Sequence, residues 1–335
     1  MIQTKKVVAA AFLAALFCQI GFAQGAPPTI LVIDVENQVV YNQDVFDVSK
    51  FATDPNITTR VLGRNFAQFS FLGDIVAVNG QPVKGTHFGA QQAATLRTAP
   101  TPGQGIGDTG RDVMGYRFFD ILNLDGTLIG SIVTLGAQGG PAPPGAPLAM
   151  TGNAGAIVGG TGAFLGVRGQ AGQPQPNPIA ARFASITEDP ANRRTNGGGR
   201  VRVVLQVIPM FRPEIVVTPG GPAVTHSSDF SLVTASKPAA AGETLSAFVT
   251  GLGPTRPGVD PGKPFPASPP AVVNSPVEVT VNGRPAEVLA AVGYPGAVDS
   301  YQVNFRVPSE TARGTATVQV TAAWIAGPEV RIAVQ

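Results

Sequence analysis

Apolar residues that recur at every second position are the feature that most limits what this chain can fold into. The clearest run begins at Arg200, where Val201, Val203, Leu205 and Val207 alternate with mostly polar residues. Such alternation is typical of β-strands that have one face in a core and the other in water. After the first 23 residues no sustained 3.6-residue apolar pattern occurs. The sequence therefore predicts an all-β protein.

Several further segments carry strand or turn signals. Asp125-Gly126 and Asn282-Gly283 stand between apolar runs and are typical of hairpin turns. The chain has 41 glycines and 31 prolines but an ordinary apolar fraction of 44%, which favours many short strands over disorder. Residues 73–111 and 137–153, rich in Gly, Pro and Gln, are expected to be surface loops. The other expected strands are residues 30–35, 61–72, 115–122, 128–135, 245–251, 277–281, 301–307, 316–320 and 330–334.

The first 23 residues have the composition of a secretory signal peptide. Lys5 and Lys6 form a basic start, an apolar run follows, and small residues end at Ala23. The run is shorter than the roughly 20 apolar residues that cross a bilayer. We expect cleavage near Ala23, export to the periplasm or beyond, and no membrane span in the mature chain.

Cysteine and charge exclude several classes of function. Cys18 is the one cysteine, and it leaves with the signal peptide, so the mature chain forms no disulfide or thiolate site. A lipoprotein modified at Cys18 is the alternative, but Phe17 is larger than the residue that lipoprotein processing prefers. The net charge of +2 falls to about zero without Lys5 and Lys6, and Arg193-Arg194 is the main basic cluster. No nucleic-acid partner is expected.

A glycine-rich stretch points to a fold family. Its conspicuous residues are Gly159, Gly160, Thr161, Gly162, Phe164, Arg168 and Gly169. Together with residues 125–136, this order resembles the dirigent and allene oxide cyclase proteins. The resemblance implies an eight-stranded antiparallel barrel over residues 28–212 with an apolar interior, whose closure removes exposed sheet edges.

The motif can also be interpreted from its residues alone, without the resemblance. Gly159, Gly160 and Gly162 permit positive φ in a tight turn, and Phe164 would plug one end of the barrel. A phosphate-binding loop would need Lys followed by Ser or Thr, but Leu165-Gly166 stand there. No nucleotide or other cofactor is therefore expected.

The last third of the chain predicts a second domain. Residues 213–222 are rich in Pro and Gly and are expected to be a linker. Short alternating strands over residues 223–335 favour an immunoglobulin-like β-sandwich. Residues 241–245, 250–254, 281–286 and 301–308 resemble a C-terminal module of secreted proteins of acidobacterial type. The resemblance carries no activity with it.

Candidate site residues are polar groups near the barrel strands. They are Asp34, Glu36, Tyr41, Asp112, Tyr116, Arg117 and Asp120. In the enzymes of the resembled family such groups act on a reactive apolar intermediate, although turn caps and surface charges explain them as well. Burial beside aromatic residues would raise the pKa of a carboxyl such as Asp120.

The two histidines add little to these candidates. His87 and His226 fall in different expected domains and have no cysteine beside them, so no metal site is expected. No Gly-x-Ser-x-Gly elbow occurs, so no Ser-His-Asp triad with His87 as its base is expected, and His87 is interpreted as a loop or surface residue. We expect a non-catalytic binding or cell-surface protein, whose partner is a small apolar molecule in the barrel or another extracellular protein. An isomerase or cyclase is the alternative. Carbohydrate binding is a second alternative, but it would need a row of exposed aromatics, and Trp324 is the one tryptophan.

Overall fold

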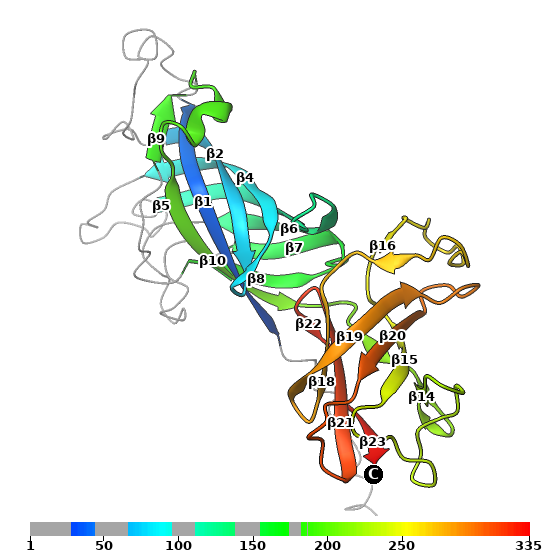
Figure 1. Cartoon of the computed structure of the whole chain (residues 1–335). Coiled ribbons are helices and arrows are strands. Elements are labelled where there is room, and N and C mark those ends of the chain that lie inside the picture. The colour runs from blue at the N-terminus through cyan, green and yellow to red at the C-terminus, as the bar shows by residue number, and fades with distance from the viewer. Residues whose placement is uncertain (1–27, 44–65, 96–110, 138–154, 174–181, 186) are drawn as a thin grey trace, which may run out of the picture.

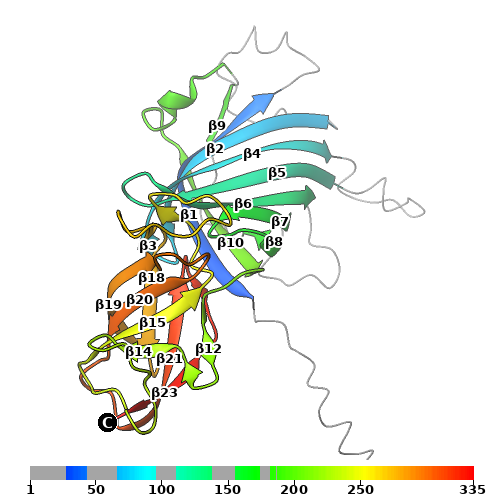
Figure 2. The ribbon, with the colours of Figure 1, turned by 90° about the vertical axis from the view of Figure 1, so that its right-hand side faces the viewer.

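The computed structural model describes residues 28–43, 66–95, 111–137, 155–173, 182–185 and 187–335, so the expected signal peptide lies outside the described residues. In this part of the chain the elements are β-strands and one short 3-10 helix, η2 (Pro190–Arg193). Figures 1 and 2 show two strand assemblies, with the second at one end of the first. The predicted all-β class is confirmed.

Eight of the described strands close into an antiparallel barrel (Figure 1). Each pairs with its neighbour along the path, and pairing between the first two strands closes the ring. A short strand, β3 (Gln81–Pro82), pairs antiparallel with the end of β2, and β9 (Arg182–Ser185) pairs parallel with β1. The barrel strands in spatial order are β1 (Thr29–Gln43), β2 (Phe66–Val78), β4 (Lys84–Thr95), β5 (Arg111–Leu122), β6 (Leu128–Ala137), β7 (Gly155–Gly162), β8 (Arg168–Gly172) and β10 (Gly199–Ile208).

The barrel core follows from alternation along these strands. In β10, Val201, Val203, Leu205 and Val207 are buried while Arg202 faces solvent, as the pattern predicts. The inward side chains join one hydrophobic cluster with the large residues of β1, β2, β5 and β6. The burial of apolar surface that this alternation permits is the main force that stabilises the barrel.

One expected loop is wrong. Residues 73–111 were expected to be a surface loop, but β2 continues to Val78 and β4 occupies Lys84–Thr95. The inward positions of β4 are Gly85, His87, Gly89 and Gln91, which are small or polar. Because an apolar alternation is missing at these positions, periodicity alone does not detect this strand.

The second assembly contains eleven described strands in one curled sheet around its own core. The expected hairpin turn at Asn282-Gly283 joins β18 to β19, with both residues at positive φ. Its strands are β11 (Glu214–Ile215), β14 (Val224–His226), β15 (Thr244–Thr250), β16 (Thr255–Arg256), β17 (Val272–Val273), β18 (Val277–Val281), β19 (Arg284–Gly293), β20 (Tyr301–Arg306), β21 (Gly314–Ala322), β22 (Ile325–Ala326) and β23 (Val330–Val334).

Residues 213–222, expected to be a linker, contribute β11 to this sheet. They also form a small hairpin of β12 (Val217–Thr218) and β13 (Gly221–Pro222).

The two assemblies meet at one end of the barrel, which we call the closed end because Phe164 and residues of the second assembly pack into the barrel core there. The hairpin between β21 and β22 places Ala323 and Ile325 in the barrel core cluster, which also contains Phe164 of the barrel itself. The Trp324 indole N–H donates to Gln81 Oε1 at 2.7 Å. On the other side, Asn274 Nδ2 donates to the carbonyl of Leu128 at 2.9 Å. The second assembly therefore supplies part of the barrel core.

Candidate functional site

A layer of polar side chains crosses the barrel interior. We define the interior polar layer as Gln38, His87, Gln91, Arg117 and Thr134, all of which are buried. His87 is 1% exposed and Arg117 is 5% exposed. Buried polar groups need partners to offset their lost hydration, so such a layer in an apolar core marks a candidate site.

Strand register places these side chains together. Arg117 on β5 lies opposite Gly89 of β4 and Thr134 of β6. The His87 ring packs between Phe71 and Phe119, with centroid distances of 4.9 and 4.8 Å. Register and ring contacts therefore bring Arg117, Thr134 and His87 together, since His87 and Arg117 both lie against the Phe71 ring.

His87 is a neutral imidazole with a defined tautomer. Burial, and then the charge of Arg117, holds the pKa of His87 well below its usual range. Its Nδ1 lies 3.0 Å from Gln38 Oε1, which is an acceptor, so Nδ1 carries the proton. Nε2 therefore presents a lone pair, and among the described residues it has no hydrogen-bond partner.

Arg117 supplies a positive charge next to this acceptor. Burial lowers its pKa to about 10, so the guanidinium remains charged at neutral pH. The guanidinium carbon lies 5.3 Å from the centroid of the Phe71 ring, in a cation–π arrangement. The interior thus offers a hydrogen-bond acceptor and a cationic donor side by side.

The other sequence candidates lie elsewhere. Asp34 and Glu36 are on the outer face, where they pair with Arg202 at 2.6 Å and Arg200 at 3.2 Å. Tyr41 belongs to a small separate cluster with Val39, Leu72 and Ala184. Burial, and then the nearby Glu188 carboxylate, raises the pKa of the Tyr41 hydroxyl.

Three candidates belong to β5, the strand of Arg117. Tyr116 faces outward and packs edge-on against Phe118 at 5.7 Å. Asp120 is partly buried, which raises its pKa. The backbone of Asp112 lies opposite Ala94, but its side chain is outside the described residues. Of the seven candidates, Arg117 is the one that the described structure places in the interior polar layer.

His87 itself was misread from the sequence. It was expected in a loop or on the surface, but it is buried in β4. Gln38, Gln91 and Thr134 were not singled out either. The spacing Gly85-x-His87-x-Gly89-x-Gln91 could have revealed the inward face of a strand with small and polar residues.

The glycine motif lies at the closed end of the barrel. Gly162 has a positive φ of 61°, but Gly159 and Gly160 do not. Gly160 is required instead by a close approach, because a Cβ there would overlap the carbonyl oxygen of Phe164. Phe164 is fully buried in the core cluster, and Thr161 Oγ1 lies 2.5 Å from Ser131 Oγ.

The end of the motif begins β8. Arg168 Nη1 donates to the carbonyl of Val167 at 2.9 Å, and Gly169 has a φ of 138°. These contacts assign the motif a role in turning the chain from β7 into β8.

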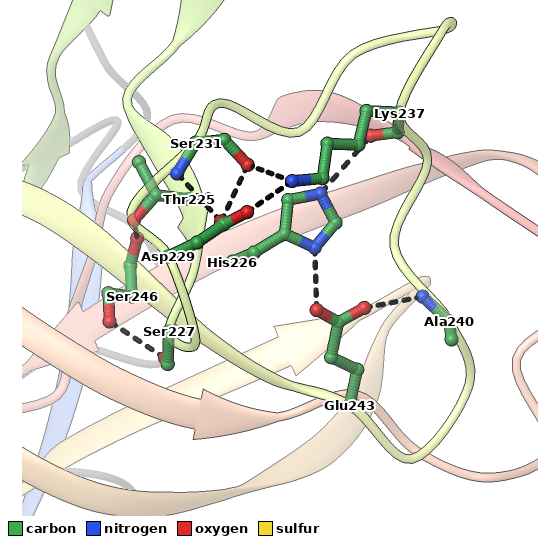
Figure 3. A network of polar contacts seen from close by, with 9 residues as sticks. All are labelled: Thr225, His226, Ser227, Asp229, Ser231, Lys237, Ala240, Glu243 and Ser246. Carbon is green, nitrogen blue, oxygen red and sulfur yellow. Dashed lines mark hydrogen bonds and ion pairs between the residues drawn. The ribbon is translucent and has the colours of Figure 1, made fainter.

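The second histidine ties down a loop of the second sheet (Figure 3). His226 Nδ1 lies 2.5 Å from Glu243 Oε1, and Nε2 lies 3.2 Å from the carbonyl oxygen of Lys237. The other carboxylate oxygen of Glu243 accepts from the Ala240 N–H at 2.8 Å. Asp229 pairs with Lys237 in the same network. These contacts hold the segment between β14 and β15 against the sheet.

The described residues contain no group of three or more His, Cys, Asp or Glu that could hold a metal ion. None of the helical segments in the described ranges has the length and apolar character that a membrane crossing requires. No family model matches the chain, and no curated protein is significantly similar to it. Inference about function therefore starts from the barrel interior.

Proposed function

We propose that this chain is an exported, non-catalytic binding protein whose barrel holds a small, mainly apolar ligand against the interior polar layer. The observation that carries the proposal is the buried Nε2 lone pair of His87, which has no partner among the described residues and lies beside charged Arg117. A buried acceptor without a donor is costly, and a bound hydroxyl or N–H would satisfy it.

The surrounding residues define the chemistry of this ligand. Phe71, Phe119 and the apolar core below them favour a ring or hydrocarbon body. His87 Nε2 would accept from a hydroxyl or N–H group of the ligand, and Arg117 would donate to an oxygen. The ligand therefore combines an apolar body with one or two oxygen-containing groups.

The family and the destination of the chain are part of the same proposal. The closed antiparallel barrel and the glycine motif with its buried Phe164 support a relationship to the dirigent and allene oxide cyclase proteins. The curled second sheet supports an immunoglobulin-like module. The basic and apolar start of the chain supports export, as expected of a signal peptide.

An isomerase or cyclase remains the alternative, because a neutral imidazole can accept a proton and an arginine can stabilise an oxyanion. A binding function is favoured over an enzymatic one, because binding needs only the acceptor of His87 and the donors of Arg117. The two functions differ in one observable: an enzyme releases a product of altered structure from the bound molecule, whereas a binding protein releases the molecule unchanged.

Fluorescence titration of the mature protein tests the proposal with three naphthalene probes. Naphthalene itself offers no polar group, 2-naphthol offers a donor for His87, and 2-naphthoate offers acceptors for Arg117. We expect both polar probes to bind about tenfold more tightly than naphthalene, since one satisfied buried polar group contributes roughly 1–3 kcal/mol.

Two variants and a control assign the contacts. His87→Leu should remove the advantage of 2-naphthol, and Arg117→Met should remove that of 2-naphthoate, while Tyr116→Ser on the outer face should change neither. Equal binding of all three probes, or variants that bind like the wild type, would contradict the proposal.

One observation favours the carbohydrate alternative. Phe88, Tyr116 and Phe118 form an exposed aromatic row on the outer face of β4 and β5. Their rings are tilted by 55° and 74° to one another, so they offer no flat platform of the kind on which a sugar ring stacks. Binding of soluble oligosaccharides that is lost in Tyr116→Ser would support this alternative.

A further inference from the structure

A pocket lies between the two assemblies. Its volume is about 320 Å³. It is lined from the barrel side by Gly162, Ala163 and Leu165 within the glycine motif, and from the other side by loops of the second sheet. A Cβ at Gly253 would lie 3.1 Å from Ala163 Cα, which shows how closely the two sides approach. Small-molecule sites have volumes of roughly 300–1,000 Å³, so this pocket suits a compact ligand.

The walls of the pocket are apolar and accessible. Leu165 and Phe211 are each 58% exposed and Val298 is 52% exposed. Beneath them the rings of Phe265 and Tyr301 are buried, with centroids 5.0 Å apart. Single exposed apolar residues are common on proteins, but three that converge on one concave site from three chain segments indicate a binding surface.

The hydroxyl of Tyr301 does not compete for a ligand. It donates to the carbonyl of Gly253 at 2.7 Å. Burial, and then the adjacent Asp299 carboxylate, raises the pKa of this hydroxyl, so it stays protonated. The floor of the pocket is therefore a satisfied, apolar aromatic surface with Asp299 at its edge.

The rim carries one further group of each charge. Asp260 and Lys263 belong to one turn, in which the Lys263 N–H donates to the Asp260 carbonyl at 3.0 Å. Within the described part of the chain, no ion pair joins either side chain to the other or to a third residue. An acid and a base on the lip of an apolar pocket complement a ligand head group that itself carries both charges.

We propose that this pocket binds a free α-amino acid with an aromatic or branched apolar side chain. The side chain lies between Leu165, Phe211 and Val298 over the two buried rings. The ammonium group of the ligand faces Asp260 and the carboxylate faces Lys263. This site shares no residue with the interior polar layer, so it stands or falls independently of the barrel ligand.

Nuclear magnetic resonance titration of the full mature chain tests the proposal with three probes that share a phenyl ring and differ in their charged groups. L-Phenylalanine carries both charges, 3-phenylpropionate carries only the negative one and phenethylamine only the positive one. We expect L-phenylalanine to shift the resonances of pocket residues and to bind about tenfold more tightly than either analogue, since each lost charge-assisted contact is worth a tenfold change or more.

Variants separate the head-group contacts from the apolar ones. Lys263→Ala should weaken the binding of L-phenylalanine about tenfold and leave the binding of phenethylamine unchanged. Asp260→Ala should also weaken the binding of L-phenylalanine about tenfold, but it should leave the binding of 3-phenylpropionate unchanged. Phe211→Ser should weaken all three probes. Leu289→Ser is the control, because Leu289 is similarly exposed at 45% but lies on β19 outside the pocket.

Two results would overturn the proposal. The first is the absence of shifts at the pocket with any probe while the wild type remains folded. The second is an equal affinity for L-phenylalanine and for one of its singly charged analogues, which would show that the rim does not recognise both charges of the ligand.

Discussion

His226 shows how one side chain can hold a long loop in place. Both of its ring nitrogens face oxygen atoms of the loop that follows β14: Nδ1 faces the Glu243 carboxylate, and Nε2 faces the Lys237 carbonyl (Figure 3). The ring is buried, and the loss of either contact would leave an acceptor without its donor.

We predict that His226→Leu lowers the free energy of unfolding by about 1–3 kcal/mol, because Glu243 then loses its partner in a partly buried position. Urea denaturation at neutral pH measures the change. Lys237→Met is the matched control, since it breaks an exposed ion pair in the same network and should cost less than about 1 kcal/mol. An equal effect of both substitutions would show that the ring is not the anchor.

The contacts of Asp74 predict a contribution to stability that depends on pH. Burial raises the pKa of this carboxyl, but hydrogen bonds from Arg193, Asn37 and Arg194 outweigh burial and lower the pKa overall. A group whose pKa is lower in the folded state stabilises the fold above its unfolded pKa of about 3.9, and that stabilisation is lost as the pH falls further.

We therefore predict that Asp74→Asn lowers the free energy of unfolding by about 1–2 kcal/mol at pH 7, and that the difference from the wild type shrinks below about pH 4. Urea denaturation at several pH values measures it. Asp34→Asn, in an exposed pair on the outer face, is the control and should show a smaller difference at pH 7. A difference for Asp74→Asn that stays constant down to pH 2 would contradict this account.

At the scale of elements, sequence periodicity succeeds where the barrel is apolar and fails where it is polar. β10 was predicted because Val201, Val203 and Leu205 alternate with polar residues. β4 was missed because its inward positions are Gly85, His87, Gly89 and Gln91, and these same residues build part of the candidate site. Periodicity detects strands by their apolar faces, so it does not detect β4, whose inward face is polar where it contributes to the candidate site.

The inward glycines of β4 give a test of this view. A Cβ at Gly89 would overlap the Phe71 ring and the Tyr116 carbonyl oxygen. We predict that Gly89→Ala destabilises the protein by about 1–3 kcal/mol, as overpacking usually does. Thermal unfolding followed by circular dichroism measures the change. Ala90→Ser, one position along on the outer face, is the control and should change the stability little. An equal loss of stability in the two variants would contradict this interpretation of the inward glycines.

At the scale of the whole molecule, the second assembly supplies residues to the barrel core. Ile325 is 2% exposed and belongs to the barrel cluster, although it comes from β22. The sequence indicated a Pro- and Gly-rich boundary at residues 213–222, but it could not show this contact, because the β21–β22 hairpin lies about a hundred residues further along the chain. Contacts between residues so far apart leave no local pattern.

We predict that the two assemblies unfold together. Trp324 is the one tryptophan and its indole bonds Gln81 across the interface, so its fluorescence reports on their contact. The fluorescence transition in urea should coincide with that of far-ultraviolet circular dichroism. Ile325→Ala should lower the free energy of unfolding by about 2–4 kcal/mol, as buried large-to-small substitutions do, and should move both transitions to lower urea concentration together. A fluorescence transition well before the loss of strand structure would show that the assemblies separate first.

The state of the His87 ring tests the central claim most directly, and the chain has only two histidines to distinguish. Nitrogen-15 spectra of the imidazole rings, with His87→Leu for assignment, report which nitrogen is protonated. Because burial holds the pKa of His87 well below its usual range, we expect the ring to be neutral at neutral pH, with its proton on Nδ1, and its Nε2 resonance to shift when 2-naphthol is added. A ring that titrates near pH 6.5, or an Nε2 resonance that 2-naphthol leaves unchanged, would contradict a ligand site in the barrel.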